Sequence, residues 1–161
     1  MAEPFSGGNI KTLPEEVVEF FHAQGFVVVS TIGYEGAIHN SCKGIVEIRR
    51  SGEIFLMDLY LGQTFDNLKR NHHISLTAVD EHKFKGYCLQ GKAKVFSRDD
   101  LGDEAIKAWE DKITSRLTHR LLKNIREEKG HAGHPEILLP RPEYMIVVEV
   151  ERVIDLTPRQ Q

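Results

Sequence analysis

The chain has 161 residues, enough for one domain with a sizeable core but few for two. Its 40% of hydrophobic and 28% of charged residues are ordinary for a globular protein, and a net charge of −3 excludes the basic surplus typical of nucleic-acid-binding domains. No apolar run could span a bilayer and no export signal is recognisable, so we expect a cytoplasmic protein without a membrane anchor.

The first part of the chain predicts a loose arm, residues 1–11, followed by a short amphipathic helix. Thr12 is expected to cap this helix because Glu15 lies three residues further on, and Gly25 is expected to end it. The predicted apolar face consists of Leu13, Val17, Phe20 and Phe21. This face indicates packing against an apolar partner.

Three strands joined by tight turns follow and predict an antiparallel meander. The runs are residues 26–31, 37–49 and 53–59, separated by the turn sequences 33–36 and 50–52. β-Branched residues dominate the first run, and the third is an apolar run typical of a buried strand.

A short connector helix is predicted in the stretch 59–71, between the third strand and the next. Gly62 precedes Thr64, which we expect in an N-cap position, and Lys69 and Arg70 lie at the end of the helix. Free N–H groups and the positive helix end make such an N-terminus a place where anions bind. Simple capping of a connector is the alternative interpretation.

Alternating patterns predict two further strands at 74–79 and 87–96, and a closing strand at 143–154. Gly91, inside the second of these, indicates a bulge or the close approach of another backbone or a ligand. A long helical pattern covers about 101–127. Small antiparallel sheets of this kind usually close into a barrel because closure removes exposed edges.

The predicted fold is therefore mainly β. It is a six-stranded antiparallel barrel with a short N-terminal helix, a connector helix and a long helix before the last strand. We expect one domain over residues 1–161, with the arm 1–11 and a tail at 155–161.

Motifs of hydrolytic and phosphoryl-transfer enzymes are absent. His131 and His134 have a ligand-like spacing, but a polar loop is the favoured interpretation, and we predict no metal site. Cys42 and Cys88 stand alone, which fits a reducing cytosol; a disulfide between them stays open. His39 is the most suggestive acid or base, but we assign no catalytic residue.

Hydrogen-bond donors gather in the second strand, near the connector helix. Ser41 and Lys43 belong to that strand, whereas Gln63, Thr64 and Asn67 belong to the connection that follows the third strand. Donors on two neighbouring elements beside a helix N-terminus favour a ligand that carries a phosphate.

The ordered set of these segments resembles the pyridoxamine 5′-phosphate oxidase-like FMN-binding split barrels, particularly their small single-domain members. The segments are residues 25–31, 33–36, 40–43, 64–71 and 86–96. The resemblance implies a six-stranded split barrel, a homodimer, and FMN in a groove at the dimer interface. It also implies that the strand around Gln90 approaches the flavin from the other subunit.

The resemblance implies that the FMN phosphate is held near Thr64 and Asn67. The cofactor-binding residues suggested in this way are Asn40, Ser41, Cys42, Lys43, Gln63, Thr64, Asn67, Tyr87 and Gln90.

Two departures from the family pattern are apparent. Many relatives carry Lys or Arg where this chain has Gln63, so a phosphate would need another cation, such as Lys43, Lys69 or Arg70. The C-terminal arginine segment that true pyridoxamine phosphate oxidases use for their substrate is missing, so that reaction is not assigned.

The favoured function is a flavin-dependent oxidoreductase that acts on a small-molecule substrate. The alternatives are a non-catalytic flavin carrier or electron-transfer protein, and a binder of haem or a deazaflavin in the same groove.

Overall fold

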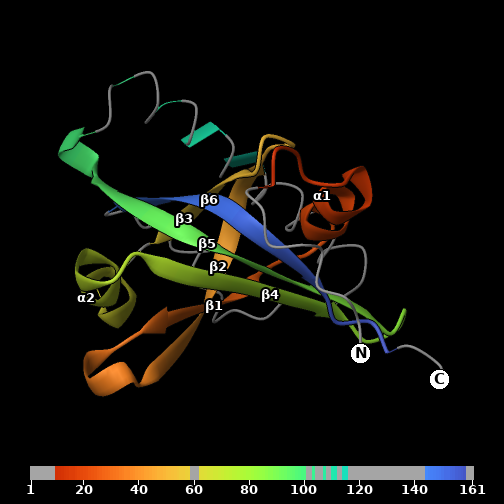
Figure 1. Cartoon of the computed structure of the whole chain (residues 1–161). Coiled ribbons are helices and arrows are strands. Elements are labelled where there is room, and N and C mark those ends of the chain that lie inside the picture. The colour runs from red at the N-terminus through yellow and green to blue at the C-terminus, as the bar shows by residue number, and fades with distance from the viewer. Residues whose placement is uncertain are drawn as a thin grey trace, which may run out of the picture.

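The computed structural model describes residues 10–58, 62–100 and 144–158, and six further positions between 103 and 115. Six antiparallel strands form a closed barrel in the order β1-β2-β3-β6-β5-β4 (Figure 1). The strands are β1 (Val27–Ile32), β2 (Ile38–Ile48), β3 (Glu53–Asp58), β4 (His73–Asp80), β5 (Lys85–Ser97) and β6 (Tyr144–Asp155). The mainly β fold and the six-stranded antiparallel barrel are thereby confirmed.

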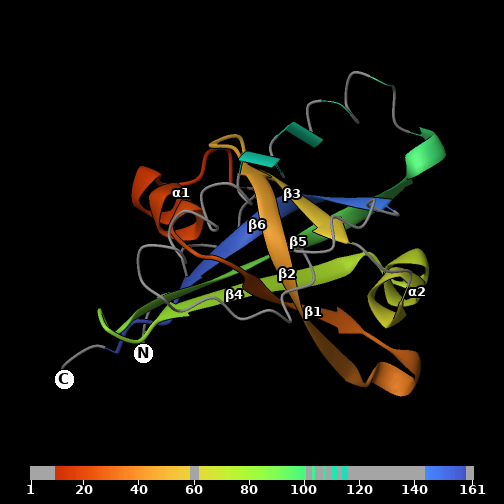
Figure 2. The same ribbon diagram turned by 180° about the vertical axis from the view of Figure 1, so that it is seen from behind.

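Two α-helices, α1 (Glu15–His22) and α2 (Gln63–Arg70), lie at opposite ends of the barrel, as both views show (Figures 1 and 2). Short 3₁₀ turns occupy Tyr34–Gly36 and Arg98–Asp100. No helix in the described part of the chain is long and apolar enough to cross a membrane.

Parts of the expected architecture lie outside the described residues. The six described positions between 103 and 115 are helical, in agreement with the long helix. Its remainder, the arm over residues 1–9, the loop with His131 and His134 and the end of the tail at 159–161 lie outside the described residues.

The core fills the barrel because alternate side chains of each strand point inward. Val29, Leu56, Leu76, Leu89 and Ile146 are among its fully buried members. Helix α1 adds an apolar face to this core. Its contribution consists of Val17, Phe20 and Phe21.

The start of α1 differs from the prediction. The residue before the first helical turn is Pro14, and no side chain caps the helix, so the predicted cap by Thr12 is wrong. The carbonyl oxygen of Pro14 accepts hydrogen bonds from the N–H groups of Val17 and Val18, at 3.1 and 3.2 Å. The proline ring fixes φ at a value that suits a helix start, and this preference outweighs the threonine signal.

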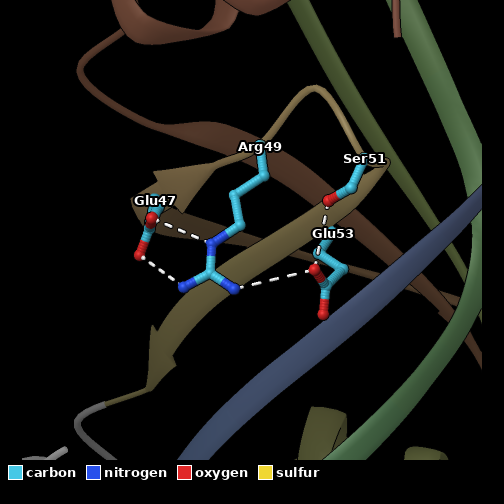
Figure 3. Close-up of polar contacts among 4 residues, drawn as sticks. All are labelled: Glu47, Arg49, Ser51 and Glu53. Carbon is cyan, nitrogen blue, oxygen red and sulfur yellow. Dashed lines mark hydrogen bonds and ion pairs between the residues drawn. The ribbon is translucent and has the colours of Figure 1, made fainter. Parts of the chain in front are cut away.

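Four side chains hold the turn between β2 and β3 (Figure 3). Arg49 donates two hydrogen bonds to Glu47, at 3.0 and 3.4 Å, and lies 3.6 Å from Glu53. Ser51 donates to Glu53 at 3.1 Å. Gly52 has a φ of +90°, which favours glycine. These exposed contacts contribute little stability but fix the register of the turn.

A bulge interrupts the pairing of β5 with β6. Gln90 pairs with Arg152. The next residue, Gly91, pairs with Val150, which leaves one extra residue in β6. A Cβ atom on Gly91 would lie only 2.0 Å from the carbonyl oxygen of Glu149. The predicted bulge and close backbone approach at Gly91 are both confirmed.

This close approach makes a testable prediction for Gly91. Gly91→Ala should lower the free energy of unfolding by about 2 kcal/mol or more, because the backbone of β6 must move away. Gly62→Ala is the matched control, since its Cβ meets no atom within 4 Å. Urea unfolding measures both variants, and an equal loss in the two would contradict the steric explanation.

Candidate functional site

Helix α2 begins without a side-chain cap. Its N-cap residue is Gly62, in extended backbone, and Thr64 is the second helical residue. The prediction that Thr64 occupies an N-cap position is therefore wrong. The hydroxyl of Thr64 instead forms a hydrogen bond with that of Ser41 in β2, at 3.0 Å, so a tertiary contact replaces the local one.

Hydrogen bonds join α2 to the two strands beside it. Besides the Ser41–Thr64 contact, Asn67 donates through Nδ2 to the hydroxyl of Thr31 in β1, at 3.0 Å. Arg70 donates to Oδ1 of Asn67, at 2.8 Å. Thr31, Thr64 and Asn67 are buried. We refer to Thr31, Ser41, Thr64, Asn67 and Arg70 as the α2 cluster.

Arg70 is the cation of this cluster. Its guanidinium lies 3.5 Å from the ring centroid of Tyr34, at the tip of the β1–β2 hairpin. One of its five N–H groups serves Asn67. Lys69 lies over the ring of Phe65, at 5.0 Å. Of the cations suggested as substitutes for one at position 63, Arg70 is therefore the one built into the α2 cluster.

Lys43 has a different environment. Its ammonium forms an ion pair with the carboxylate of Asp58, and the hydroxyl of Tyr144 donates to the same carboxylate oxygen. All three residues are buried. Burial, followed by the hydrogen bond to Asp58, raises the pKa of Tyr144 above its ordinary value. The positive charge of Lys43 is thus balanced inside the protein by the carboxylate of Asp58.

The suggested residues of β2 and α2 do not share one face. Ser41 and Lys43 point inward, toward α2 and the core. Asn40 and Cys42 alternate with them and are exposed on the outer face of the barrel. Gln63 is exposed at the start of α2.

Tyr87 and Gln90 lie apart from the α2 cluster. The buried ring of Tyr87 contacts Phe20 of α1, with ring centroids 5.1 Å apart. Gln90 is half-buried and lines a cavity on the outer face of the barrel. Cys42 and Cys88 are both free, so the disulfide that the sequence left open does not form.

The cavity has a volume of about 890 Å³. It lies along β1, β2, β4, β5 and β6, and its lining includes Thr31, Ile38, His73, Ser75, Gln90 and Arg152. Thr31 therefore belongs both to this lining and to the α2 cluster. The volume falls within the range of small-molecule sites in proteins.

Three polar residues with buried partners were not predicted from the sequence. Thr31 continues the inward alternation of Val27 and Val29, so a hydroxyl at that phase was a recognisable signal. Asp58 ends an apolar run, and a charge there needs a partner. Nothing in the local sequence marks Tyr144 as that partner.

Comparison with known proteins now identifies the family. The sequence profile of pyridoxamine 5′-phosphate oxidase matches residues 13–139. The chain belongs to this family. No curated protein sequence matches the chain.

Solved structures of the same fold include HupZ of Group A Streptococcus, with 18% identity, a TM-score of 0.65, and coverage of 90% of this chain and 94% of that one. A conserved hypothetical protein of Mycobacterium tuberculosis has 18% identity and a TM-score of 0.65, covering 95% and 93%. An F420 reductase has 12% identity and a TM-score of 0.55, covering 88% and 98%. Similarity at these identities shows the fold alone.

The Asp58 contacts predict the behaviour of a Tyr144→Phe variant of this family member. Removing the hydroxyl leaves the buried carboxylate with one donor fewer, so the free energy of unfolding at neutral pH should fall by about 2 kcal/mol. Phe55→Leu, a change in β3 away from these contacts, is the control in the same denaturant titration. A loss in Tyr144→Phe no larger than in the control would contradict the assigned hydrogen bond.

The raised pKa of Tyr144 adds an alkaline signature. An unfolded tyrosine ionises near about pH 10, so the unfolded chain loses this proton before the folded protein does. The stability due to neutral Tyr144 is complete below about pH 10 and is lost as the pH rises above it. At about pH 11 the folded wild type and Tyr144→Phe should show equal tyrosinate absorbance, and the wild type should show one tyrosinate more only after unfolding.

Proposed function

We propose that this protein is an FMN-binding flavoprotein and a flavin-dependent oxidoreductase, with FMN at a homodimer interface and its phosphate near Thr64 and Asn67. The observation that carries the proposal is the α2 cluster: the hydroxyls of Ser41 and Thr64 lie at the uncapped N-terminus of α2, and the amide of Asn67 and the guanidinium of Arg70 follow along the same helix. Membership of the family supports it.

The donors of the α2 cluster fit a phosphate. The first N–H groups of a helix have no intrahelical partner, and α2 has no side chain that caps them. The bond between Ser41 and Thr64 uses one of their two hydroxyl protons, so the other is left to donate. Arg70 keeps further N–H groups after its bond to Asn67.

Bound FMN would supply the transfer of a hydride or of electrons. The residues of this chain would bind, orient and shield it. Ser41, Thr64 and Arg70 would hold the phosphate end, and Asn67 would fix Arg70. The cavity of about 890 Å³ that shares Thr31 with the α2 cluster has room for the body of the ligand.

The proposed homodimer has support from exposed apolar side chains near the cavity. Tyr34 and Ile38 are both 75% exposed, and Ile38 lines the cavity. Exposed apolar groups beside a binding site are typical of surfaces that a partner covers. The cytoplasmic location that we infer has support from the two free thiols, Cys42 and Cys88.

The second candidate is a protein that binds a deazaflavin or haem in the same groove, and Gln63 is the residue that supports it. This uncharged, exposed residue stands where many relatives carry a cation. The fold is also that of an F420 reductase. A flavin carrier without turnover is the remaining alternative. The absorption spectrum of the purified protein separates these ligands, and saturable oxidation of an organic substrate separates an enzyme from a carrier.

The proposal predicts the effect of removing two polar groups of α2. Replacing Thr64 and Asn67 together with Ala should weaken FMN binding by about tenfold or more, because both are expected at the phosphate. Fluorescence titration of the apoprotein with FMN measures the loss.

Two further variants keep this prediction interpretable. Thr64→Val removes only the hydroxyl at similar shape and should show part of the loss. Thr77→Ala, in β4 and outside the α2 cluster, should leave FMN affinity unchanged. Equal FMN affinity in all variants would return α2 to a plain connector helix.

The exposed position of Gln63 allows a gain-of-affinity test. Gln63→Arg should tighten FMN binding several-fold, by about 1 kcal/mol, because it adds a cation at the start of α2. The effect should shrink as salt is added. Riboflavin, which lacks the phosphate, is the control ligand, and an equal gain for riboflavin would contradict a phosphate site at this helix end.

A further inference from the structure

A row of polar side chains crosses the outer face of the barrel. In the strand registers, Ser30 of β1 is opposite Ser75 of β4, and Ser75 is opposite Gln90 of β5. Gln90 in turn is opposite Arg152 of β6. Each of these four residues is half-buried and lines the cavity of about 890 Å³. We refer to these four residues as the outer polar row.

Arg152, at one end of the outer polar row, has an Nε–H group that makes no hydrogen bond to the described residues. This Nε atom is buried, and its N–H donates to no group among the described residues. No described carboxylate forms an ion pair with it. A buried N–H group without a partner is costly, and a guanidinium matches the two oxygens of a carboxylate in particular. Arg152 is therefore suited to bind an anion from the cavity.

The other ionisable side chains of the cavity lining have partners of their own. Glu151, next to Arg152, lies 3.6 Å from the ammonium of Lys92. His73 contacts the side-chain oxygen of Asn71 through Nδ1, at 2.9 Å. An oxygen is an acceptor, so this contact suits a proton on Nδ1.

Part of the remaining lining is apolar. This apolar part consists of Ile32, Ile38 and Ile74, and Ile38 is 75% exposed. Apolar walls with a few convergent polar groups are typical of sites for small organic molecules. The cavity thus offers an apolar surface for the body of a ligand and one cation for its charge.

We infer that the cavity binds a small organic anion, a carboxylate with an apolar body, whose carboxylate is held by Arg152 and the amide of Gln90. The binding of this ligand to the cavity does not depend on the proposed function. Its role as the second reactant of a flavin enzyme rests on the proposed function. The volume, near the upper end for small-molecule sites, leaves room for a reactant beside a flavin. A hydride or electron transfer between the flavin and this reactant requires that the two lie in contact.

The test uses 2-naphthoate as the probe, with 2-naphthamide as its neutral counterpart and 2-naphthyl phosphate as a second anion. Equilibrium dialysis against the full-length protein should give naphthoate about tenfold tighter binding than naphthamide. Arg152→Gln should abolish this difference by weakening naphthoate alone. Arg152→Lys should retain part of it, since a lysine keeps the charge but loses the fork. Tighter binding of the phosphate than of the carboxylate would overturn the assigned ligand class.

Two control variants isolate the local charge. Glu151→Gln removes the neighbouring negative charge and should tighten naphthoate but not naphthamide. Arg49→Gln changes an exposed arginine in the β2–β3 turn and should leave both affinities unchanged (Figure 3). Equal binding of naphthoate and naphthamide, or an unchanged ratio in Arg152→Gln, would overturn the inference.

FMN titration of the same variants separates this inference from the proposed function. Arg152→Gln should keep its FMN affinity within about twofold of wild type, because the proposed phosphate contacts belong to the α2 cluster and Arg152, on β6, lies three strands away from Thr31 on β1. A parallel loss of FMN and naphthoate binding would assign Arg152 to the flavin and overturn the inference. A wild type that discriminates naphthoate through Arg152 but takes up no FMN would refute only the flavin.

Discussion

The buried carboxylate of Asp58 is the constraint on which the candidate site depends. It ends β3 and is held by Lys43 of β2 and Tyr144 of β6, so it ties three neighbouring strands of the barrel together. An unpaired charge at this depth would be costly, and each partner is therefore needed. The ring of Tyr144 also contacts Phe65 of α2, with centroids 4.8 Å apart. Tyr144 thus links the compensated charge of Asp58 to α2.

The barrel could be predicted because apolar and polar residues alternate within the strands. The bulge could be predicted because Gly91 interrupts one of these strands. The helix starts were predicted less accurately, because several residues near a helix start can act as the cap and tertiary contacts can replace the cap. Pro14 outweighed Thr12, and Thr64 found a partner 23 residues away in Ser41. The sequence suggested Ser41, Thr64 and Asn67 as residues of one site. In the structure Thr64 contacts Ser41 of β2, and Asn67 contacts Thr31 of β1. Closure of the barrel determines which strands lie next to a helix, and local sequence patterns do not predict this.

The β1–β2 hairpin serves two sites because strands alternate. Thr31 points inward, where its hydroxyl accepts a hydrogen bond from Asn67, and it also borders the cavity, whereas the side chain of Ser30 points outward into the cavity. Ser41 likewise faces α2, and Asn40, opposite Ser30, faces out. Residues adjacent in sequence thus supply chemistry to different faces. A sequence motif in this hairpin therefore does not define one binding surface, although its residues are contiguous.

The charge of the cavity depends on the bulge in the same way. In a regular strand, Glu151 and Arg152 would point to opposite faces, and one of them would enter the apolar core. The extra residue opposite Gly91 turns both outward, and both line the cavity. Only glycine fits there, because any Cβ would collide with the backbone of Glu149. One backbone requirement in β5 therefore accompanies the outward position of an arginine on β6, which makes Gly91 as important for the lining of the cavity as for the fold.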